Sequence, residues 1–372
     1  MPAYHLIEVK TRQQKKAFWR LSSLIYQHDP NWIPHRRKDE IAVFDPQKNE
    51  HAKEAQYVRF LLHDGQKYVG RIAAFILRGD QDKLGRIGFF ESIREQEVAF
   101  KLFAAAEHWL RQKGISSIEG PVNLGEKERF WGLMASNSIS NPYLHNYHPA
   151  YYQAFFEEWG FQTHYQQFYY VYRIEDGLPA AYQKMYSRLM EQQKYSLKML
   201  DMRLHDQFLR DFVQVYNDAW TSHDSFQPIS YDKAGKIFSL LRPIMEESGM
   251  WFAYEKSEVI GIFFMIPDIN QLWQKIPTKL PTLLRNLWFY ILLRLKKWNR
   301  RQVFGLGVRS AWQRKGVEAL LLQAAQLDAE QEGRIKEILI AWIGDFNPKM
   351  VNLAGKFCGP PVRTSITYRK DI

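Results

Sequence analysis

The stretch VRSAWQRKGVEALLL, residues 308–322, passes from a β-strand pattern through a polar turn into an apolar helical pattern. The turn carries Arg309, Arg314, Lys315 and Gly316 just before the helix. The first turn of a helix has unpaired backbone N–H groups and a partial positive charge. A glycine lets an anion approach that backbone, and flanking cations add charge-assisted hydrogen bonds. The stretch therefore predicts a phosphate-binding turn, with a solvated basic turn as the alternative.

The net charge of the chain is concentrated around this stretch. The sequence has 51 Lys and Arg residues against 40 Asp and Glu residues, a net charge of +11. Between Asp268 and Glu318 there is no acidic residue but eleven basic ones, so this interval carries the whole excess. A local basic field indicates a local anionic partner: a phosphorylated cofactor, an acidic membrane surface or nucleic acid.

The length and composition are those of a folded protein with two domains. At 372 residues the chain is too long for one ordinary core, and 46% of its residues are hydrophobic. A single cysteine, Cys358, excludes an internal disulfide framework and a thiolate-rich metal site. The first residues include cations without an apolar run after them, so no secretory signal is predicted and we expect a cytoplasmic protein.

The two halves of the chain repeat the same order of features. Residues 67–77 and 258–267 both combine a charged lead-in, a glycine and a buried strand, and both halves later end a helix on a glycine before another strand. The repeat predicts two similar α/β lobes, each with strands and helices interleaved around a mixed α+β sheet. We expect a first lobe at 1–175, a helical connector at 176–195, and a second lobe at 196–372 with an insertion at 272–302.

The glycine turn resembles the acyl-CoA-binding motif of the GNAT N-acyltransferase superfamily. It lacks the GxxxxGKS/T and GxGxxG spacings of nucleotide sites, but it fits the superfamily pattern Gln/Arg-x-x-Gly-x-Gly/Ala at Gln313 and Gly316 and departs from it at Glu318. The resemblance implies acyl-CoA as a co-substrate, with no permanently bound cofactor. The implied CoA-binding residues are Val308, Arg309, Gln313, Arg314, Lys315, Gly316, Val317, Glu318 and, opening a later helix, Asn347.

By the same resemblance, the first lobe is a degenerate copy. Its strand–helix junction, FFESIREQE at 89–97, has no glycine turn and no cation cluster, and Phe156 stands where the superfamily has a tyrosine. In the second lobe Ala354 and Gly355 occupy the region where a tyrosine usually protonates the leaving thiolate. The fold expected is therefore a tandem GNAT fold whose second lobe holds the donor, with the first as scaffold or substrate wall.

Three further segments are similar to a narrower group of two-lobed bacterial GNAT-like proteins. They are DPNWIPH (29–35), EGPVN (119–123) and PDIN (267–270). The group includes ceramide-synthase-type enzymes, so the resemblance implies transfer of an acyl group from acyl-CoA, or an acyl carrier protein, to an amine, here a lipidic long-chain base at the membrane. A soluble N-acetyltransferase of a small or protein amine and a non-catalytic GNAT-fold binding protein are the alternatives.

The insertion predicts a basic amphipathic helix. Its longest uncharged run, 286–293, is far shorter than the roughly 20 residues that span a bilayer. Apolar residues recur at helical spacing beside a cationic end, which is typical of a helix lying on anionic lipid; the alternative is a core-packed helix. The aromatic residues cluster with the apolar ones, so we expect no nucleic acid. The predicted apolar face comprises Leu284, Leu287, Ile291, Leu295 and Trp298.

N-acylation needs a base for the ammonium, a donor to the oxyanion and a proton for the thiolate. Asp268 and Asn270 follow a buried run, and Asp345 follows another, so these three are the candidate catalytic residues. A strand-ending turn for Asp268 and a helix cap for Asp345 are the alternatives. By resemblance to the superfamily, a backbone N–H near Val308 would serve the oxyanion.

Two other reactive residue types carry no predicted role. His145 and His148 have the spacing of one helix face, but Pro149 disturbs that helix and no carboxylate partner is evident, so no metal site is expected. Cys358 lies near a Gly-Pro-Pro turn without a nearby histidine, which argues against a nucleophile.

Overall fold

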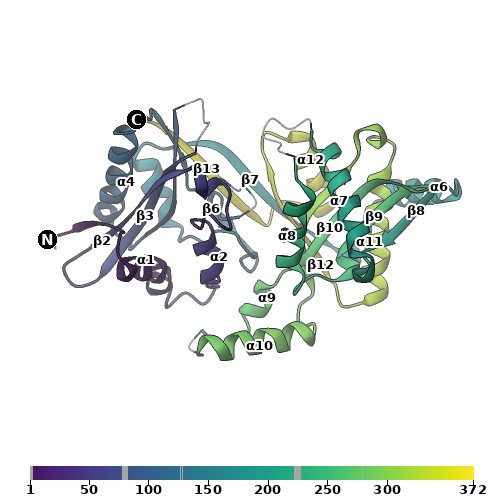
Figure 1. Cartoon of the computed structure of the whole chain (residues 1–372), viewed down its shortest axis with the longest axis horizontal. Helices are drawn as coiled ribbons and strands as arrows, with labels where there is room; N and C mark the ends of the chain where they lie inside the picture. The colour runs from purple at the N-terminus through teal and green to yellow at the C-terminus, as the bar shows by residue number, and fades with distance from the viewer. Residues whose placement is uncertain (1–2, 78–82, 126, 128, 222–227, 279) are drawn as a thin grey trace. The chain divides into compact units, whose positions relative to one another are not determined.

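A computed structural model describes residues 3–372 except 78–82, 126, 128, 222–227 and 279, and the chain divides into two compact units (Figure 1). Unit 1 comprises residues 1–168, 343–351 and 362–372, and unit 2 comprises residues 169–342 and 352–361. The boundary at 168 lies close to the predicted end of the first lobe. The final strand, however, belongs to unit 1, whereas the sequence pattern assigned it to the second lobe, because the pattern does not specify which sheet a strand enters.

Unit 1 is built on a mixed sheet in the order β1-β2-β3-β4-β5-β13-β7, with β6 paired to β13. The first four strands are antiparallel, β4 and β5 are parallel, and β13 is antiparallel to β5. Thus the last strand of the chain lies between two strands of its first half. The strands are β1 (His5–Glu8), β2 (Gln56–His63), β3 (Tyr68–Ile76), β4 (Leu84–Ser92), β5 (Ser117–Gly120), β6 (Leu133–Asn137), β7 (Gln162–Arg173) and β13 (Arg363–Asp371).

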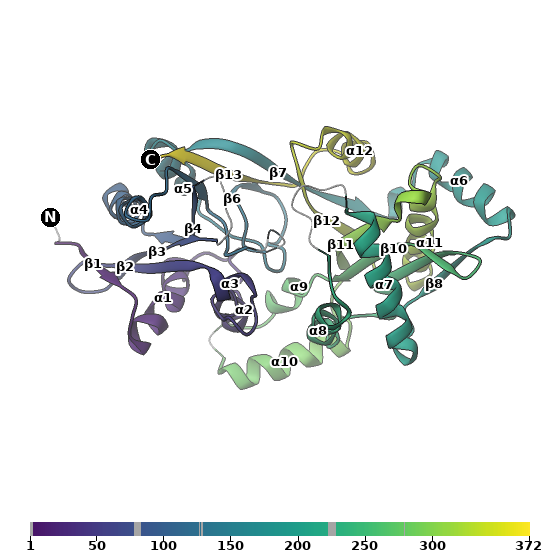
Figure 2. The ribbon, with the colours of Figure 1, turned by 45° about the horizontal axis from the view of Figure 1, so that its top comes forward.

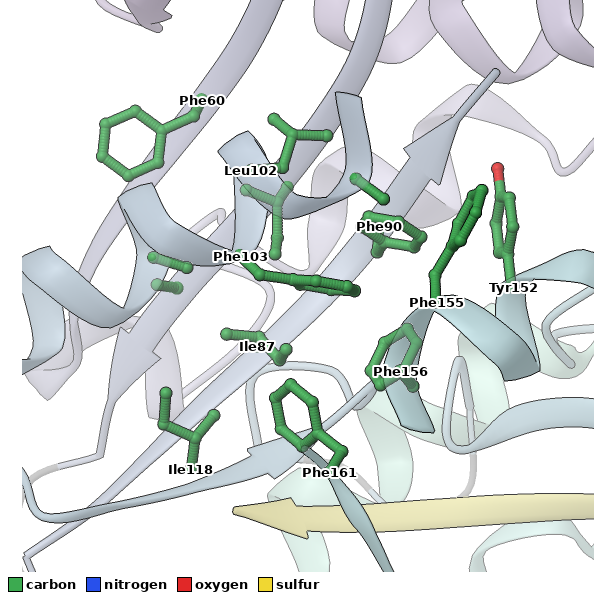
Figure 3. Packing of buried hydrophobic residues seen from close by; sticks show 14 of the residues in the cluster. Phe60, Ile87, Phe90, Leu102, Phe103, Ile118, Tyr152, Phe155, Phe156 and Phe161 are labelled. Carbon is green, nitrogen blue, oxygen red and sulfur yellow. The ribbon is translucent and has the colours of Figure 1, made fainter. Parts of the chain in front are cut away.

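The helices of unit 1 cover this sheet and bury an aromatic core. Phe103 of α4 stacks on Phe90 of β4 with ring centroids 4.7 Å apart, and Phe156 of α5 packs edge-on against both (Figure 3). Such aromatic contacts contribute beyond the burial of area alone. The helices are α1 (Arg12–Ile25), α2 (Arg37–Ala42), α3 (His51–Glu54), α4 (Gln96–Arg111) and α5 (Tyr151–Glu158).

Unit 2 repeats this design with the sheet order β7-β12-β11-β10-β9-β8, β7 entering it from Tyr169. Neighbouring strands from β8 to β11 are antiparallel, and β11 and β12 are parallel. The strands are β8 (Tyr195–Met199), β9 (Met250–Glu255), β10 (Glu258–Pro267), β11 (Arg300–Val308) and β12 (Glu337–Gly344). The helices are α6 (Ala180–Glu191), α7 (His205–Ala219), α8 (Tyr231–Leu241), α9 (Asn270–Trp273), α10 (Thr282–Arg294), α11 (Val317–Glu332) and α12 (Pro348–Cys358).

Helices α7 and α11 pack on opposite faces of the unit 2 sheet. A Cβ atom on Gly307 would meet Trp220 just after α7, whereas one on the neighbouring-strand residue Gly261 would meet Leu321 of α11. Alternating residues of a strand point to opposite faces, so each glycine lets one helix approach closely. The predicted connector contains α6, which packs against α11 and thus forms part of unit 2.

The basic interval is partly neutralised inside unit 2. The buried Arg301 guanidinium is 3.3 Å from Glu246 and from Glu332, and 3.4 Å from Asp328. Arg300 pairs with Glu337 at 2.7 Å. Charges this deeply buried are retained only with such partners. The interval therefore has less uncompensated charge than its composition suggests, because acidic residues distant in the sequence surround its strand residues.

Candidate functional site

The parallel strands β11 and β12 pair only over their first halves. Arg300–Val303 lie opposite Glu337–Ile340, and no further pairing joins the described residues of these two strands. A register irregularity in the β10–β11 pairing at Phe304 marks the point of divergence. Since β10 pairs with the other edge of β11, the edge of residues 304–308 on the β12 side is left without ladder hydrogen bonds. Ligands of α/β folds bind where parallel strands end in this way.

The predicted glycine turn follows directly, and α11 begins at Val317 as expected. Arg314 and Gly316 both adopt left-handed backbone conformations, with φ of 61° and 87°. Among the described residues, the N–H groups of Arg314, Gly316, Val317 and Glu318 have no acceptor in the chain. Four such N–H groups at the start of a 16-residue helix form a concentrated positive site for an anion.

The three cations around the turn are not equivalent. Arg309 is held by Asp218, 2.9 Å from its Nε, and by Glu258, 2.7 Å from its Nη1. Burial opposes ionisation of Asp218, but hydrogen bonds from Ser310 and Arg309 outweigh it and lower the pKa of that carboxyl. Arg314 and Lys315 are instead exposed. The charge available to a ligand therefore comes from Arg314 and Lys315, and Arg309 serves to fix the turn.

Gly316 has a second structural reason to be glycine. A Cβ atom there would lie 2.6 Å from Met185 Cγ and 3.2 Å from Leu189 Cδ1, both on α6. The turn is thus covered on one side by α6, and an anion can reach the backbone only from another side. The sequence pattern gave no sign of this contact, because α6 lies about 130 residues earlier in the chain.

Glu318, the departure from the motif, is half-buried near α6. Burial raises the pKa of Tyr182 on α6, and the nearby Glu318 carboxylate adds to that rise. The Glu318 carboxylate is thus near enough to α6 for its charge to act on Tyr182.

Asp268 and Asn270 do not join the turn. Asp268 is fully buried, 3.5 Å from the Arg300 guanidinium, and its Oδ1 accepts the Asn270 N–H at 3.3 Å. Its own N–H donates to the Arg300 carbonyl, at the opposite end of β11 from Val308. Eight residues of strand separate those ends by about 26 Å. The geometry thus gives Asp268 a structural partner and no position beside the turn.

Asp345 and Asn347 lie in the segment that belongs to unit 1, whereas the turn belongs to unit 2. The Asp345 carboxylate accepts the Gln166 N–H at 2.9 Å, which ties it to β7. Asn347 Oδ1 accepts the Met350 N–H at 3.3 Å at the start of α12, a helix-capping interaction. The exposed Asp345 thus stays a catalytic candidate, and Asn347 has an observed structural role.

An aromatic wall beside β11 was not predicted from the sequence. Phe212, Tyr216 and Trp220 follow one another at four-residue spacing along and just beyond α7. Phe264 of β10 and the partly exposed Phe304 of β11 continue the wall, with centroids 5.7 Å apart. The signal in the sequence was the pair Gly305 and Gly307, whose missing side chains make room for the Trp220 ring.

Metal and thiol chemistry find no support in the described part of the chain. No group of three or more His, Cys, Asp or Glu residues there has a metal-holding arrangement. Burial raises the pKa of Cys358 to about 12, so its thiol stays protonated.

The diverging parallel strands and the glycine-started helix, present in a chain of two similar units, are those of the tandem GNAT fold. The solved structure of a tandem GNAT protein from the clavulanic acid biosynthesis pathway matches 99% of this chain and 98% of its own, with TM-score 0.55 and 12% identity. A GCN5-related glucosamine N-acetyltransferase region of a fungal multi-domain GH3 β-N-acetylglucosaminidase matches all of this chain, with TM-score 0.58 and 14% identity. The chain spans 38% of that larger protein.

Among curated proteins, a bacterial ceramide synthase from Caulobacter vibrioides is similar to the whole chain. The two are 26% identical over 377 residues, which cover 99% of this chain and 97% of the synthase. No family model matches the sequence. The predicted tandem GNAT fold is thus confirmed, and these relatives and structural neighbours, named as acyl- or acetyltransferases, are consistent with an acyltransferase.

Proposed function

We propose that this protein is an N-acyltransferase whose unit 2 holds an acyl thioester of CoA, or of an acyl carrier protein, at the turn formed by residues 309–318. The supporting observation is the set of four backbone N–H groups at the start of α11 for which the described part of the chain offers no acceptor. They suit the pyrophosphate, or the phosphate of the carrier arm, and the exposed Arg314 and Lys315 add charge-assisted bonds. Val317 and Glu318 contribute through their backbone N–H groups, and the Gln313 side-chain amide donates to the Val308 carbonyl at 3.1 Å, which ties the turn to the end of β11.

The unpaired edge of β11 supports a role in the transfer step. An amine nitrogen attacks the thioester carbon and the carbonyl oxygen becomes an oxyanion. The carbon–sulfur bond then breaks, and the leaving thiolate takes up the proton that the attacking nitrogen releases. The N–H groups of residues 304–308 on the β12 side have no ladder partner among the described residues and can donate to that oxyanion. The ammonium proton must pass to a base before attack.

A lipidic amine is the acceptor that we propose. The curated relative is named a ceramide synthase, and the aromatic wall of unit 2 offers apolar surface next to β11. An acceptor with a long apolar chain gains roughly 0.8 kcal/mol per buried methylene on such a surface. A small soluble amine would gain little there.

The insertion helix α10 supports action at a membrane surface. It follows α9 of unit 2 in the chain (Figures 1 and 2). Phe289 is its one buried residue, and its ring centroid lies 4.5 Å from that of Trp273. Most of its other side chains are exposed, which favours a surface helix over the core-packed alternative. Seven apolar side chains are 45–83% exposed: Leu283, Leu284, Leu287, Trp288, Tyr290, Ile291 and Leu295.

These seven side chains occupy a single arc of α10, with the exposed cations Arg294, Lys296 and Lys297 at its end. Trp298, predicted on the same face, is instead buried beneath the Arg334 guanidinium, 3.8 Å from its ring. An apolar arc flanked by cations favours anionic lipid as the partner. No helix in the described part of the chain is long and apolar enough to span a bilayer.

Thiol release from acetyl-CoA and from palmitoyl-CoA tests the proposal. Each donor is offered with a long-chain amino alcohol and with small amines, in the presence and absence of vesicles containing phosphatidylglycerol. We expect turnover with palmitoyl-CoA and the long-chain amine, increased by the vesicles. Turnover with acetyl-CoA alone, unchanged by vesicles, would indicate a soluble acetyltransferase. The absence of both turnover and CoA binding would indicate a non-catalytic protein that does not bind this donor.

A further inference from the structure

Unit 1 contains a buried polar cavity that the acyl-transfer site in unit 2 does not use. Its walls come from α1, α2, β3, β4 and the loops at 32–35 and 144–148. The cavity has a volume of about 20 Å³, enough for one water-sized group. The residues that matter most for its chemistry are Trp32, His35, Glu40, Arg71, Glu91 and His148.

Two carboxylates face one guanidinium in this cavity. Arg71, on β3, donates to the Phe18 carbonyl at 2.7 Å and lies 3.4 Å from Glu91 Oε1 and 3.6 Å from Glu40 Oε1. One buried guanidinium thus serves two buried carboxylates. With both carboxylates ionised the group carries a net negative charge, which is costly in a buried site unless a cation joins it.

The two carboxylates differ in how well they are satisfied. Glu91 Oε2 accepts hydrogen bonds from the Tyr26 hydroxyl at 2.6 Å and the Tyr152 hydroxyl at 2.9 Å. Glu40 is only 6% exposed, and among the described residues its one side-chain partner is Arg71, whose guanidinium lies 3.6 Å from Oε1. A carboxylate can accept about four hydrogen bonds. Glu40 therefore has unused acceptor capacity at the cavity wall.

The histidines of the cavity contribute no positive charge. Nδ1 of His148 accepts the Met134 N–H at 3.1 Å, so the neutral ring carries its proton on Nε2. Burial lowers the pKa of His148 to about 3 and that of His35 to about 4. Both rings are neutral at physiological pH. Most of the remaining wall is aromatic, and the ring centroids of Trp32 and Tyr26 are stacked 5.3 Å apart.

We propose that this cavity binds the ammonium head of a primary amine. An –NH₃⁺ group has the size of one water and three N–H donors, which match the open acceptors of Glu40 and the adjoining Glu91. It also neutralises the excess negative charge, and the aromatic wall stabilises a cation further. A secondary or tertiary ammonium is too large for the space. The inference concerns unit 1 alone and stands whether or not unit 2 transfers acyl groups.

The ionisation of Glu40 makes this binding depend on pH. The groups facing it are Arg37 from α2, Arg71 from β3, Glu91 from β4, and the neutral His35 and His148. Burial outweighs Arg71 and raises the pKa of Glu40 to about 7. An ammonium ion needs the ionised carboxylate, so affinity rises with pH up to about 7 and levels off above it. Below pH 7, each decrease of one pH unit lowers the affinity for the amine about tenfold.

Calorimetric titration of the full chain with ethylammonium and ethanolamine at pH 8 tests the site, with tetraethylammonium and sodium chloride as size and charge controls. We expect the two primary amines to bind and tetraethylammonium not to bind. Glu40→Gln should weaken primary-amine binding at least tenfold, and the exposed matched change Glu97→Gln on α4 should not. The titration of the unmodified chain at pH 6 and pH 8 needs no variant and should show the predicted tenfold difference.

Three results would overturn the proposal. Equal binding of tetraethylammonium would show that the cavity does not select a primary head, and displacement of the amine by equimolar sodium would show an inorganic cation site. Amine binding that is absent, or unchanged in Glu40→Gln and between the two pH values, would show that the carboxylate does not recognise an ammonium. A melting curve of each variant establishes that it is folded.

Discussion

The same strand–turn–helix junction occurs once in each unit. Its backbone groups are left open in unit 2 and are hydrogen-bonded by side chains in unit 1. In unit 2 the junction after β11 is a glycine turn with open N–H groups. In unit 1 the end of β4 is closed by tyrosines of α5: the Ser92 N–H donates to the Tyr152 hydroxyl at 2.7 Å, and the Tyr151 hydroxyl donates to the Ser92 carbonyl at 2.8 Å. A duplicated fold can thus leave one junction open for a ligand, while side chains of the same unit form the hydrogen bonds of the other junction.

The two units also differ in how their buried arginine side chains are paired with carboxylates. Unit 2 surrounds Arg301 with three carboxylates from α11 and the segment before β9, a closed network. Unit 1 sets Arg71 between Glu91 and Glu40, and in the described structure Glu40 has no side-chain partner besides this shared guanidinium, 3.6 Å away. A closed network stabilises a fold, whereas an incomplete one costs stability and is retained where a site needs it.

The largest expected effect is on the stability of unit 1. The folded state raises the pKa of Glu40 from 4.5 to about 7, so folding disfavours the ionised form and the penalty grows as pH rises from 4.5 to 7. Glu40→Gln should therefore stabilise the protein by about 3 kcal/mol at pH 8 and by little at pH 4.5. Urea unfolding at the two pH values measures this. An equal effect at both would contradict an ionisable, strained carboxylate.

The next effect concerns the donor turn of unit 2. Reversing both exposed cations, Arg314→Glu with Lys315→Glu, should weaken CoA binding about 100-fold, because each charge-assisted bond contributes roughly 1.5 kcal/mol or more. Arg210→Glu with Lys236→Glu, on the exposed faces of α7 and α8, is the matched control and should leave affinity unchanged. Equal loss in both double variants would indicate general charge attraction in place of a defined turn. Equilibrium dialysis of CoA provides the measurement.

A smaller effect is expected on the surface helix. Leu287→Glu or Ile291→Glu on α10 should reduce binding to phosphatidylglycerol vesicles about tenfold, since a charge replaces exposed apolar surface at the lipid. Leu240→Glu on α8 alters another exposed leucine of unit 2 and should have no effect. Vesicle co-sedimentation measures both. If the α10 variants bind vesicles normally but change the molar mass in solution, the apolar arc joins two copies of the chain.

The smallest effect is at the closed junction of unit 1. Tyr152→Phe removes an acceptor for the Ser92 N–H and one of two hydroxyl donors to Glu91, and should cost about 1 to 2 kcal/mol in stability. CoA affinity should not change, because the donor turn lies in unit 2. Unfolding and dialysis on the same preparation separate the two quantities. A CoA affinity that falls with this variant would place part of the donor site in unit 1.

The fold was predictable from the sequence because its evidence is local and repeated. Glycine caps, buried strand runs and the turn at Gly316 each occupy a few consecutive residues, and their order in both halves indicates two similar units. The pattern could not predict the ion-pair partners that are distant in the sequence. Arg309 looked like a ligand cation because Asp218 and Glu258, which bind it, lie far away in the chain.

The cavity of unit 1 was not predicted from the sequence, again because its residues are distant from one another in the chain. Glu40, Arg71 and Glu91 are each ordinary polar residues in their own segments, and only the packing of α2 on two strands brings them together out of water. The degenerate junction of that lobe also suggested a scaffold. Chemistry at buried polar groups is set by what surrounds them, which a single sequence does not display.

The place of β13 sets the order in which the protein is completed during synthesis. The sheet of unit 1 is encoded almost entirely in the first 173 residues, yet it has a position between β5 and β7 that Arg363–Asp371 must fill. The ribosome releases that strand only after all strands of unit 2 have emerged. The first unit to be translated is therefore the last to close, and until then it carries an open sheet edge that chaperones or premature pairing can engage.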